Sequence, residues 1–448
     1  MHPHTIDQAP GGAGGYLVRP GQAWFAFAMT FGLMLFDYID RQVIVSLFPY
    51  LKADWGLSDK QLGGLVSIIS IVVALGAIPV ALLADRFSRV RSILLMATLW
   101  SVATISCMFC SSYGQLFAAR AAVGAGETGY GSVGAALIAS LFPARLRSAL
   151  LGAFFAAASL GSVLGVLLGG LIAARWGWKA AFGIVGLPGL VLALAYVLVR
   201  DYRTVPLTPK LERATASAGS VARHIAKALL RSRTMLWACL GAAMQLIVVS
   251  AVWSWLPSFL NRAHGMAPDQ AGKQAALVVL AGALGSFVWG SVVDRLAQRR
   301  LRNKLLAVAL LCLVSLALLA YAFGAASAQH QLGWIVAGGF MMTCSVGPIA
   351  SVVIDVVHPA VRSTGAAVLS LFQNLLGLAL GPFVAGMLSD QWGLPTALSL
   401  IPVFSAVAAV LFVKAAASYE AEVAALAGIR LAAEGDDAPT LPGTPAAA

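Results

Sequence analysis

Twelve long apolar stretches follow one another along the chain and predict its secondary structure. They occupy, to within a few residues, 23–50, 60–84, 92–111, 114–141, 147–174, 179–199, 234–260, 271–293, 304–325, 332–357, 361–388 and 395–416. About 20 consecutive apolar residues cross the hydrocarbon core of a bilayer as an α-helix. The stretches lack the alternation of apolar and polar residues that membrane-spanning β-strands require. The pattern therefore predicts an all-α membrane protein with twelve transmembrane helices.

Polar segments beside and between these stretches divide the chain into five parts. The longest interruption follows the sixth stretch and holds eight basic residues between positions 200 and 233. We predict a disordered N-terminal tail at 1–20, an N-terminal six-helix bundle at 21–200, a cytoplasmic linker with an amphipathic helix at 201–233, a C-terminal six-helix bundle at 234–416, and a C-terminal helix followed by a disordered tail at 417–448.

The two bundles share an internal repeat. Gly161-x-x-x-Gly165 recurs 216 residues later as Gly377-x-x-x-Gly381, and a Trp-Gly pair follows each copy at the same offset. Small residues four apart let two helices approach closely in lipid, where apolar surface alone does not drive them together. Transporters are often built from internal repeats of this kind. The chain is therefore expected to form two equivalent six-helix repeats.

Composition and charge placement agree with a membrane location. Of the 448 residues, 60% are hydrophobic and 11% charged, whereas soluble domains carry about 25% charged residues. The formal net charge is +12, but 22 of the 30 Lys and Arg residues fall on the side of the two chain ends, six on the opposite side and two inside apolar stretches. Basic residues concentrate on the cytoplasmic side, so we expect both termini in the cytoplasm and no nucleic-acid partner. The excess of Arg over Lys and the abundance of Ala favour a bacterial inner membrane.

Sequence signals of catalysis or of a metal centre are missing. The six His residues lie in tails, loops or the ends of apolar stretches, and the five Cys residues lie within such stretches. The chain has neither a cluster with metal-ligand spacing nor a Gly-rich phosphate loop ending in Gly-Lys-Ser/Thr. We expect no enzyme activity, no metal and no cofactor.

Five ionisable residues interrupt the first and fourth apolar stretches. Asp37, Asp40 and Arg41 share one helix face, and Arg120 and Glu127, seven apart, share a face of another helix. Such groups must meet each other or line a water-filled cavity. One carboxyl is left without a basic partner, and the alternative is that the pairs only hold helices together. We predict that Asp40, Glu127 and Asp37 carry protons and that Arg41 and Arg120 bind the substrate.

The second half offers amides, hydroxyls and aromatic rings instead of charges. The cavity is therefore expected to be charged on one wall and mostly apolar on the other, which suits an amphipathic substrate. The further residues that we predict to bind this substrate are Tyr38, Tyr130, Gln245, Trp253, Ser254, Gln373 and Asn374.

Clusters of Asp and Arg follow the second and eighth stretches. Both copies keep the carboxylate as well as the bases, and Asp contributes little to membrane orientation. We therefore predict that these clusters are gates that latch one conformation, with anchoring alone as the alternative. The residues are Asp85, Arg86, Arg89 and Arg91 in the first copy and Asp294, Arg295 and Arg299 in the second.

Twelve helices in two repeats, with ALLADRFSRVR at 81–91 and GSVVDRLAQRR at 290–300, resemble the major facilitator superfamily. Tyr-x-Asp-Arg at 38–41 and RAAVGAGETGYGSVGAALIASLFPARLRS at 120–148 resemble its spinster group more narrowly. Members of that group are proton-linked exporters of lysophospholipids or sphingosine-1-phosphate. The resemblance implies that Asp40, Arg41, Arg120 and Glu127 form the protonation and head-group site. Asp37 departs from it, because Asn is usual before the tyrosine.

These observations predict a monomeric, proton-coupled secondary transporter of a lysophospholipid- or sphingolipid-like substrate that works by alternating access. Organic-anion symporters carry a similar Asp-Arg in their first helix, so an organic-anion or drug transporter is the alternative. A membrane sensor without transport is the remote one. The expected partners are protons, the substrate and membrane lipids. Antiport and symport both remain open.

Overall fold

Residues 16–86, 88–201, 232–298, 300–357 and 362–436 are described by the structure, a computed structural model of the chain. Within these ranges the side chains of residues 78, 81–86, 144, 148, 362–364 and 426–436 are not described. Most of the predicted N-terminal tail, the linker with its amphipathic helix and the last twelve residues lie outside the described part.

The described part of the first half is helical throughout. Serine side chains set two of the helix starts, because Ser88 Oγ accepts a hydrogen bond from Arg91 N and Ser112 Oγ accepts one from Gln115 N, as N-caps do. The helices are α1 (Pro20–Val43), η1 (Ile44–Leu47), α2 (Phe48–Trp55), α3 (Asp59–Arg86), α4 (Arg89–Ser106), η2 (Cys107–Phe109), α5 (Tyr113–Glu127), α6 (Tyr130–Leu141), α7 (Ala144–Trp176), α8 (Trp178–Ala195) and η3 (Tyr196–Leu198).

The second half repeats this arrangement. Its elements are α11 (Arg233–His264), α12 (Pro268–Ala297), α13 (Arg302–Gly324), α14 (Ala328–Met342), α15 (Val346–Asp355), α16 (Arg362–Phe372), the π-helical turn η5 (Gln373–Leu378), α17 (Leu380–Trp392), α18 (Leu394–Leu400) and α19 (Val403–Asp436). Helix α19 joins the last predicted span to the predicted C-terminal helix without a break. The two were expected to be separate, but nothing in this Ala-rich segment interrupts a helix.

Eleven helical segments among the described residues are long and apolar enough to cross a membrane. The remaining predicted span, at about 114–141, is divided into α5 and α6. Gly129 lies between them with φ of 80°, a left-handed conformation that glycine adopts without steric cost. The expectation of twelve spans therefore corresponds to eleven segments of sufficient length and apolarity and to one span divided at Gly129.

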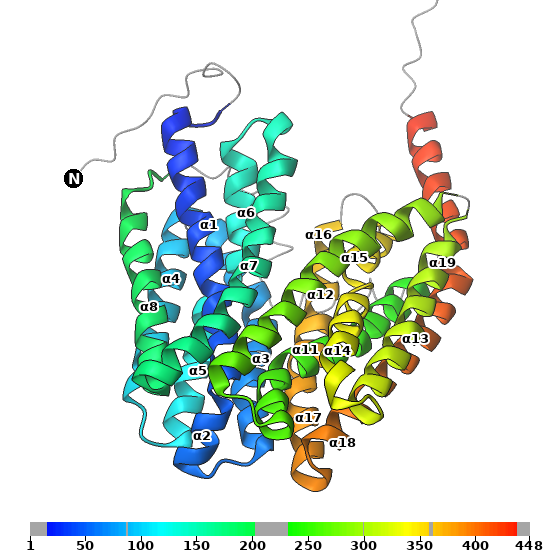
Figure 1. Ribbon diagram of the computed structural model, residues 1–448. Coiled ribbons are helices and arrows are strands. Elements are labelled where there is room, and N and C mark those ends of the chain that lie inside the picture. Colours follow the sequence, from blue (N-terminus) through cyan, green and yellow to red (C-terminus); the bar gives the residue numbers. More distant parts are fainter. Residues whose placement is uncertain (1–15, 87, 202–231, 299, 358–361, 437–448) are drawn as a thin grey trace, which may run out of the picture.

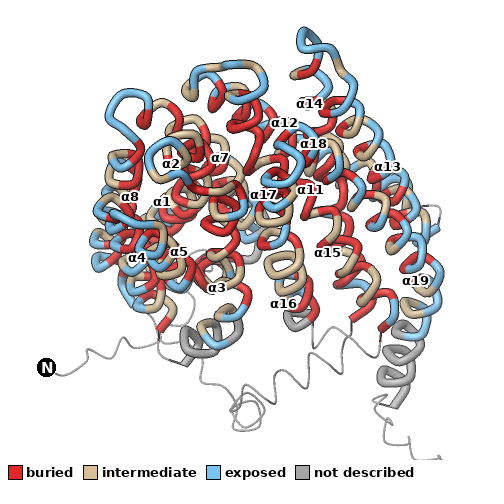
Figure 2. Tube along the Cα trace, turned by 90° about the horizontal axis from the view of Figure 1, so that it is seen from below, coloured by how far each residue is buried: buried red, intermediate tan, exposed pale blue. Residues whose placement is uncertain are grey.

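The helices form two groups that lie side by side, one from each half of the chain (Figure 1). The start of α1 and the end of α19 lie at the same end of the molecule, which we call the terminal end; α2 and α18 mark the opposite end, where the two groups are closest. Exposed residues gather on outer helices such as α4, α8, α13 and α19 (Figure 2). They include large apolar side chains such as Leu95, Leu187 and Leu310, which suits a surface that faces lipid.

The glycine repeat packs helices in the same way in both halves. A Cβ atom added at Gly165 in α7 would lie 2.7 Å from Ile39 O in α1, and one at Gly381 would lie 2.6 Å from Ile247 O in α11. Ile39 and Ile247 are therefore equivalent. The predicted role of these glycines in close helix contact is confirmed, and the contacts relate the first helix of each half by 208 residues.

Gly165→Ala should destabilise the protein, because the added methyl group would meet the α1 backbone and cannot be relieved by a side-chain rotation. Overpacking of this kind costs about 1–3 kcal/mol. Thermal unfolding in detergent should show a lower Tm. Gly152→Ala is the matched control in the same helix, since nothing lies within 4 Å of its added Cβ. Equal Tm values for the two variants would contradict the close contact.

Candidate functional site

A cavity of about 90 Å³ lies between the two halves of the molecule. Its walls combine two guanidinium groups, hydroxyls and apolar side chains. The lining residues are Tyr38, Arg41, Gln42, Val66, Ile69, Ser70, Arg120 and Ser162 from the first half and Ser250, Trp253, Ser254 and Leu378 from the second. Five of these were predicted from the sequence as substrate-binding residues: Tyr38, Arg41, Arg120, Trp253 and Ser254.

Contacts between α3 and α17 close the cavity on the side away from the terminal end. Ser67 Oγ donates a 2.5 Å hydrogen bond to Ala379 O across the two halves, one turn from the lining residues Ser70 and Leu378. Gly63, one turn further along α3, leaves no room for a Cβ beside Pro382 O. Backbone-to-backbone packing therefore seals this side of the cavity.

Arg41 connects the cavity to two buried carboxyl groups. Its Nε lies 2.7 Å from Glu127 Oε2 and 3.8 Å from Asp37 Oδ1. The guanidinium lies over the ring of Tyr38, 5.3 Å from its centroid, a favourable cation–π arrangement. Two carboxyls thus share one guanidinium, and this joins α1 to the C-terminal end of α5.

Arg120 is fully buried and bonds to backbone carbonyls. Its Nη1 donates to Asp40 O at 3.1 Å, its Nη2 to Arg41 O at 3.4 Å, and its Nε to Leu65 O at 3.5 Å. These three hydrogen bonds of the guanidinium thus go to the backbone of α1 and α3. Its positive charge is therefore held next to the cavity without a carboxylate bonded to it among the residues that the structure describes.

A change of helix type in the first span frees one of these carbonyls. Pro49 has no N–H, and its ring would clash with the carbonyl of Val45 if the α-helix continued. The chain instead forms the 3₁₀ turn η1 before α2. Ile44 N bonds to Gln42 O rather than to Asp40 O, so Asp40 O can accept from Arg120.

The Asp40 carboxyl lies behind the two arginines. Thr104 Oγ1 of α4 donates to Asp40 Oδ2 at 2.9 Å, while Asp40 Oδ1 is buried and has no hydrogen-bond partner among the described residues. Asp37 and Glu127 are 3% exposed and Asp40 1%, and none of the three lines the cavity. The guanidinium groups of Arg41 and Arg120 thus stand between the cavity and the carboxyls.

The second half is a neutral copy of this cluster. The 208-residue spacing makes Gln245 the equivalent of Asp37 and Val249 the equivalent of Arg41. Gly124 packs on Ile69 and Gly339 on Val278, which relates the fourth and tenth spans by 215 residues. By that spacing, Ile335 replaces Arg120 and Met342 replaces Glu127. The predicted difference between a charged and an uncharged wall is therefore present at equivalent positions.

Four predicted substrate-binding residues lie away from the cavity lining. Tyr130 is fully buried and donates from its hydroxyl to Thr30 O at 2.6 Å. Gln245 is also buried and donates to Met342 O at 2.9 Å. Gln373 and Asn374 are half-buried in the π-helical turn that ends at Leu378, and Asn374 Nδ2 donates to Ser370 O. Their buried or helix-bonded polar atoms give them structural contacts in this conformation.

Several lining residues were not predicted. Ser162 and Ser250 lie beside the close contacts of the glycine repeat, and Gln42 follows the charged triplet directly. Ser and Gln are ordinary residues in a membrane helix. Only their position next to a predicted feature could have indicated that they line the cavity. Trp253 offers a hydrogen-bond donor on the uncharged wall, since its Nε1 is buried without a partner among the described residues.

Three of the predicted gate residues, Arg89, Arg91 and Asp294, contact partners in their own halves. Arg89 Nη1 donates to Ser140 Oγ at 2.9 Å, Arg91 Nε lies 3.4 Å from Asp201 Oδ2, and Asp294 Oδ1 lies 2.9 Å from Lys304 Nζ. Arg295 is exposed. Arg299 and the side chains of Asp85 and Arg86 lie outside the described residues.

The chain is similar in sequence to several known proteins. The sequence profile described as Major Facilitator Superfamily matches residues 30–378. The chain is 31% identical over 375 residues to an MFS-type efflux pump of Mycolicibacterium smegmatis, with 83% of this chain and 86% of the pump covered. It is 27% identical to Protein spinster of Drosophila melanogaster, covering 82% of this chain but only 62% of that protein. A Gallate transporter of Pseudomonas putida is 28% identical, with 87% and 91% covered.

A solved structure shows the same fold. It is the crystal structure of a bacterial homolog of the human lysosomal transporter Spinster in an inward-facing, unoccupied conformation. Its TM-score with this chain is 0.79 at 22% identity, and the match covers 90% of this chain and 99% of the other. Proteins of this superfamily are transporters, which confirms the prediction that the chain is not an enzyme. The chain belongs to the major facilitator superfamily and is a spinster-like, multi-pass membrane transporter.

Proposed function

We propose that this protein is a proton-coupled secondary transporter of an anionic, amphipathic, lipid-like substrate. The observation that carries the proposal is the placement of two guanidinium groups, Arg41 and Arg120, at the cavity with three carboxyls behind them. Guanidinium groups recognise phosphate and carboxylate through paired hydrogen bonds. A head group of either kind would face both arginines and the unpartnered Nε1 of Trp253.

The size of the cavity limits what it can hold. Pockets for small molecules usually enclose about 300–1,000 Å³, whereas this one measures about 90 Å³ in the present conformation. It has room for a head group and not for an acyl chain. The chain of a lipid-like substrate would therefore extend from the cavity between the two halves toward the terminal end, where they stand apart (Figure 1).

Protonation of Glu127 would change what Arg41 can bind. With Glu127 ionised, the 2.7 Å ion pair uses the guanidinium; with Glu127 neutral, Arg41 becomes available to the anionic substrate. Asp37 and Asp40 would add further protonation sites. Proton and substrate occupancy are thereby linked through one side chain, and the linkage is reciprocal.

The orientation and setting of the protein belong to the same proposal. The positive-inside distribution of Lys and Arg supports cytoplasmic termini, so that this conformation would be open to the cytoplasm and closed on the outside. We propose a monomer in a bacterial inner membrane.

A small organic anion is the second candidate substrate. The observation that favours it is the small cavity, which a compact anion would fill without any tail. The similarity of the chain to a Gallate transporter agrees with this alternative.

Thermal stabilisation of the protein in nanodiscs distinguishes the candidates. A ligand at 100 times its Kd stabilises a protein by about 2.7 kcal/mol. Lysophosphatidic acid should raise Tm, and monoacylglycerol, which has the same acyl chain without the phosphate, should not. Stabilisation by gallate alone would favour the second candidate. Equal stabilisation by both lipids would contradict head-group recognition by arginine.

A further inference from the structure

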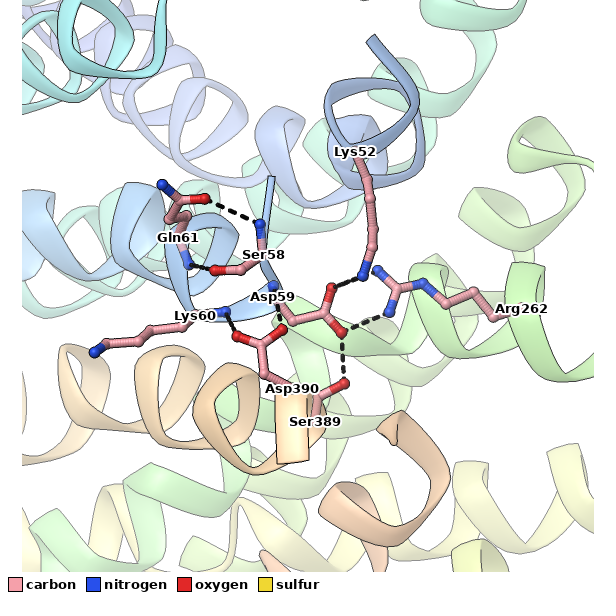
Figure 3. Close-up of polar contacts among 8 residues, drawn as sticks. All are labelled: Lys52, Ser58, Asp59, Lys60, Gln61, Arg262, Ser389 and Asp390. Carbon is pink, nitrogen blue, oxygen red and sulfur yellow. Dashed lines mark hydrogen bonds and ion pairs between the residues drawn. The ribbon is translucent and has the colours of Figure 1, made fainter. Parts of the chain in front are cut away.

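A second cavity, of about 340 Å³, lies between the halves at the end opposite the terminal end. It contains Lys52, Asp59, Arg262 and Ser389. Asp59 is the first residue of α3 and is 2% exposed. Its carboxylate lies at the centre of a group of polar side chains from both halves (Figure 3). The sequence contained no signal for this group, whose members lie near the ends of helices α2, α3, α11 and α17.

Every oxygen of the Asp59 carboxylate is bonded, mostly to the other half of the molecule. Arg262 at the end of α11 forms a bidentate pair, with Nη1 2.6 Å from Oδ2 and Nη2 2.9 Å from Oδ1. Ser389 Oγ of α17 donates to Oδ2 at 2.5 Å, and Lys52 Nζ of α2 lies 2.6 Å from Oδ1. Bidentate Arg–carboxylate pairs are among the strong and geometrically specific hydrogen bonds of proteins.

Asp390 makes a second bond between the halves. Its Oδ1 accepts from Asp59 N at 2.7 Å and its Oδ2 accepts from Lys60 N at 2.9 Å, so that a residue of α17 caps the start of α3. Helix α3 also has a cap of its own, in which Ser58 N donates to Gln61 Oε1 and Gln61 N donates to Ser58 Oγ, the reciprocal pattern of a capping box. The bonds to Asp390 are thus additional to those that α3 needs to begin.

The equivalent place on the other side of the interface lacks such a group. Gly386 packs against Asp59 O, and its repeat partner Gly170 packs against Pro268 O, 2.9 Å from an added Cβ. Pro268 therefore stands where Asp59 stands in the other half. The acid beside it, Asp269, lies 3.7 Å from Lys273 of its own helix. The close packing is present on both sides, but the carboxylate network is present on one.

We infer that Asp59, Arg262 and Asp390 form a latch that holds the two halves together at this end and must open in every transport cycle. When the halves separate, Asp59 keeps Lys52, which belongs to its own half, and loses Arg262, Ser389 and Asp390 to water. The latch therefore contributes stability only to the conformation closed at this end. A group that bonds in only one conformation shifts the equilibrium toward it.

Asp59→Asn should shift the protein toward the conformation open at this end. The substitution removes the charge, keeps the size of the side chain, and leaves Lys52 and Arg262 facing each other without a carboxylate. The expected rise in the ratio of open to closed molecules is about tenfold, since bonds between charged groups are strong. Arg262→Gln should act in the same direction. In the double variant the two effects should not add, because both remove one interaction.

Electron–electron distance measurements on spin-labelled, full-length protein in nanodiscs test the latch. Labels at Ala53→Cys in α2 and Thr396→Cys in α18 occupy exposed positions on opposite halves, and the native cysteines are all buried. The Asp59→Asn and Arg262→Gln proteins should show a larger long-distance population than the parent. Asp269→Asn, a carboxylate at the equivalent helix start, should leave the distribution unchanged.

If the distance distributions of Asp59→Asn and Arg262→Gln match that of the parent, the latch is overturned. An equal shift of the distribution in Asp269→Asn would overturn it as well. If Asp59→Asn does not fold, Arg262→Gln and Asp390→Asn are judged by the same criterion, with a monodisperse gel-filtration profile as the condition. The measurement uses no substrate. A negative result would therefore not affect the proposed substrate class, and failure of the lysolipid experiment would not affect the latch.

Discussion

Glu127→Gln should abolish proton-dependent transport while leaving substrate binding intact. Glutamine cannot carry a proton on and off, and it removes the ion pair of 2.7 Å that occupies Arg41. Loss of one partner from a buried pair costs about 3–5 kcal/mol, so the variant should also have a lower Tm than the parent. Arg41, freed from Glu127, should bind the substrate head group at least as well as before.

Proteoliposomes with a pH gradient measure the first effect. Uptake of lysophosphatidic acid and the signal of an internal pH dye should both fall to the level of empty liposomes, whereas the Tm increase caused by the same lipid should persist. Asp269→Asn is the control, because its carboxylate pairs within α12 and does not line the cavity. If Glu127→Gln keeps its pH-dependent transport, then coupling resides in Asp37 or Asp40, and the same measurement on their amide variants identifies which.

Arg120→Lys should impair binding almost as severely as Arg120→Gln. A lysine keeps the charge, but one ammonium cannot reach Asp40 O, Arg41 O and Leu65 O together. Each buried carbonyl left without a donor costs about 1–3 kcal/mol. The Tm of both variants should fall, and their affinity for lysophosphatidic acid should drop by at least about tenfold.

Comparison of the two Arg120 variants separates charge from geometry. If charge alone matters, the lysine variant should bind like the parent and the glutamine variant should not. If the fork of hydrogen bonds matters, the two should be similar. Arg145→Lys, at an exposed position early in α7, controls for the loss of a guanidinium. Parent-like binding by both Arg120 variants would contradict a role of this residue in the site.

The positions of the helices and of the charges within the membrane could be predicted from the sequence because both depend on local patterns. A run of apolar residues specifies a span by its length, and the intervals between Asp37, Asp40 and Arg41 specify a shared face. The fourth span was expected to supply partners for that face, and the structure brings Glu127 to Arg41. The glycine repeat likewise predicted close helix contacts, since only small residues permit them.

The partners of Arg120 depend on backbone geometry that hydropathy does not record. One of them, Asp40 O, is freed where α1 tightens into η1, and the sequence sign of that change was Pro49, several residues downstream. A carboxylate partner was the reasonable expectation for a buried cation. The carbonyl of Asp40 became available because α1 loses its regular hydrogen bonds at that point.

The reason why the Asp59 network could not be predicted is different. Its members lie near helix ends that are unremarkable one by one, at positions 52–60, 262 and 389–390. What joins them is the approach of two six-helix units, which no local pattern encodes. The Asp-Arg clusters predicted as gates lie at the terminal end, where the halves stand apart in this conformation.

The neutral copy in the second half has an electrical consequence. Three carboxylates and two guanidiniums give the cluster a formal charge of −1 when all are ionised and zero once one carboxyl takes up a proton. Moving one elementary charge through 100 mV of membrane potential is worth about 2.3 kcal/mol. Gln245, Val249, Ile335 and Met342 carry no charge, so the equivalent positions of the second half add nothing that offsets the cluster. Membrane voltage should therefore change the rate of the conformational step in which the cluster moves through the field without its proton. It should have almost no effect on the step in which the cluster moves with its proton.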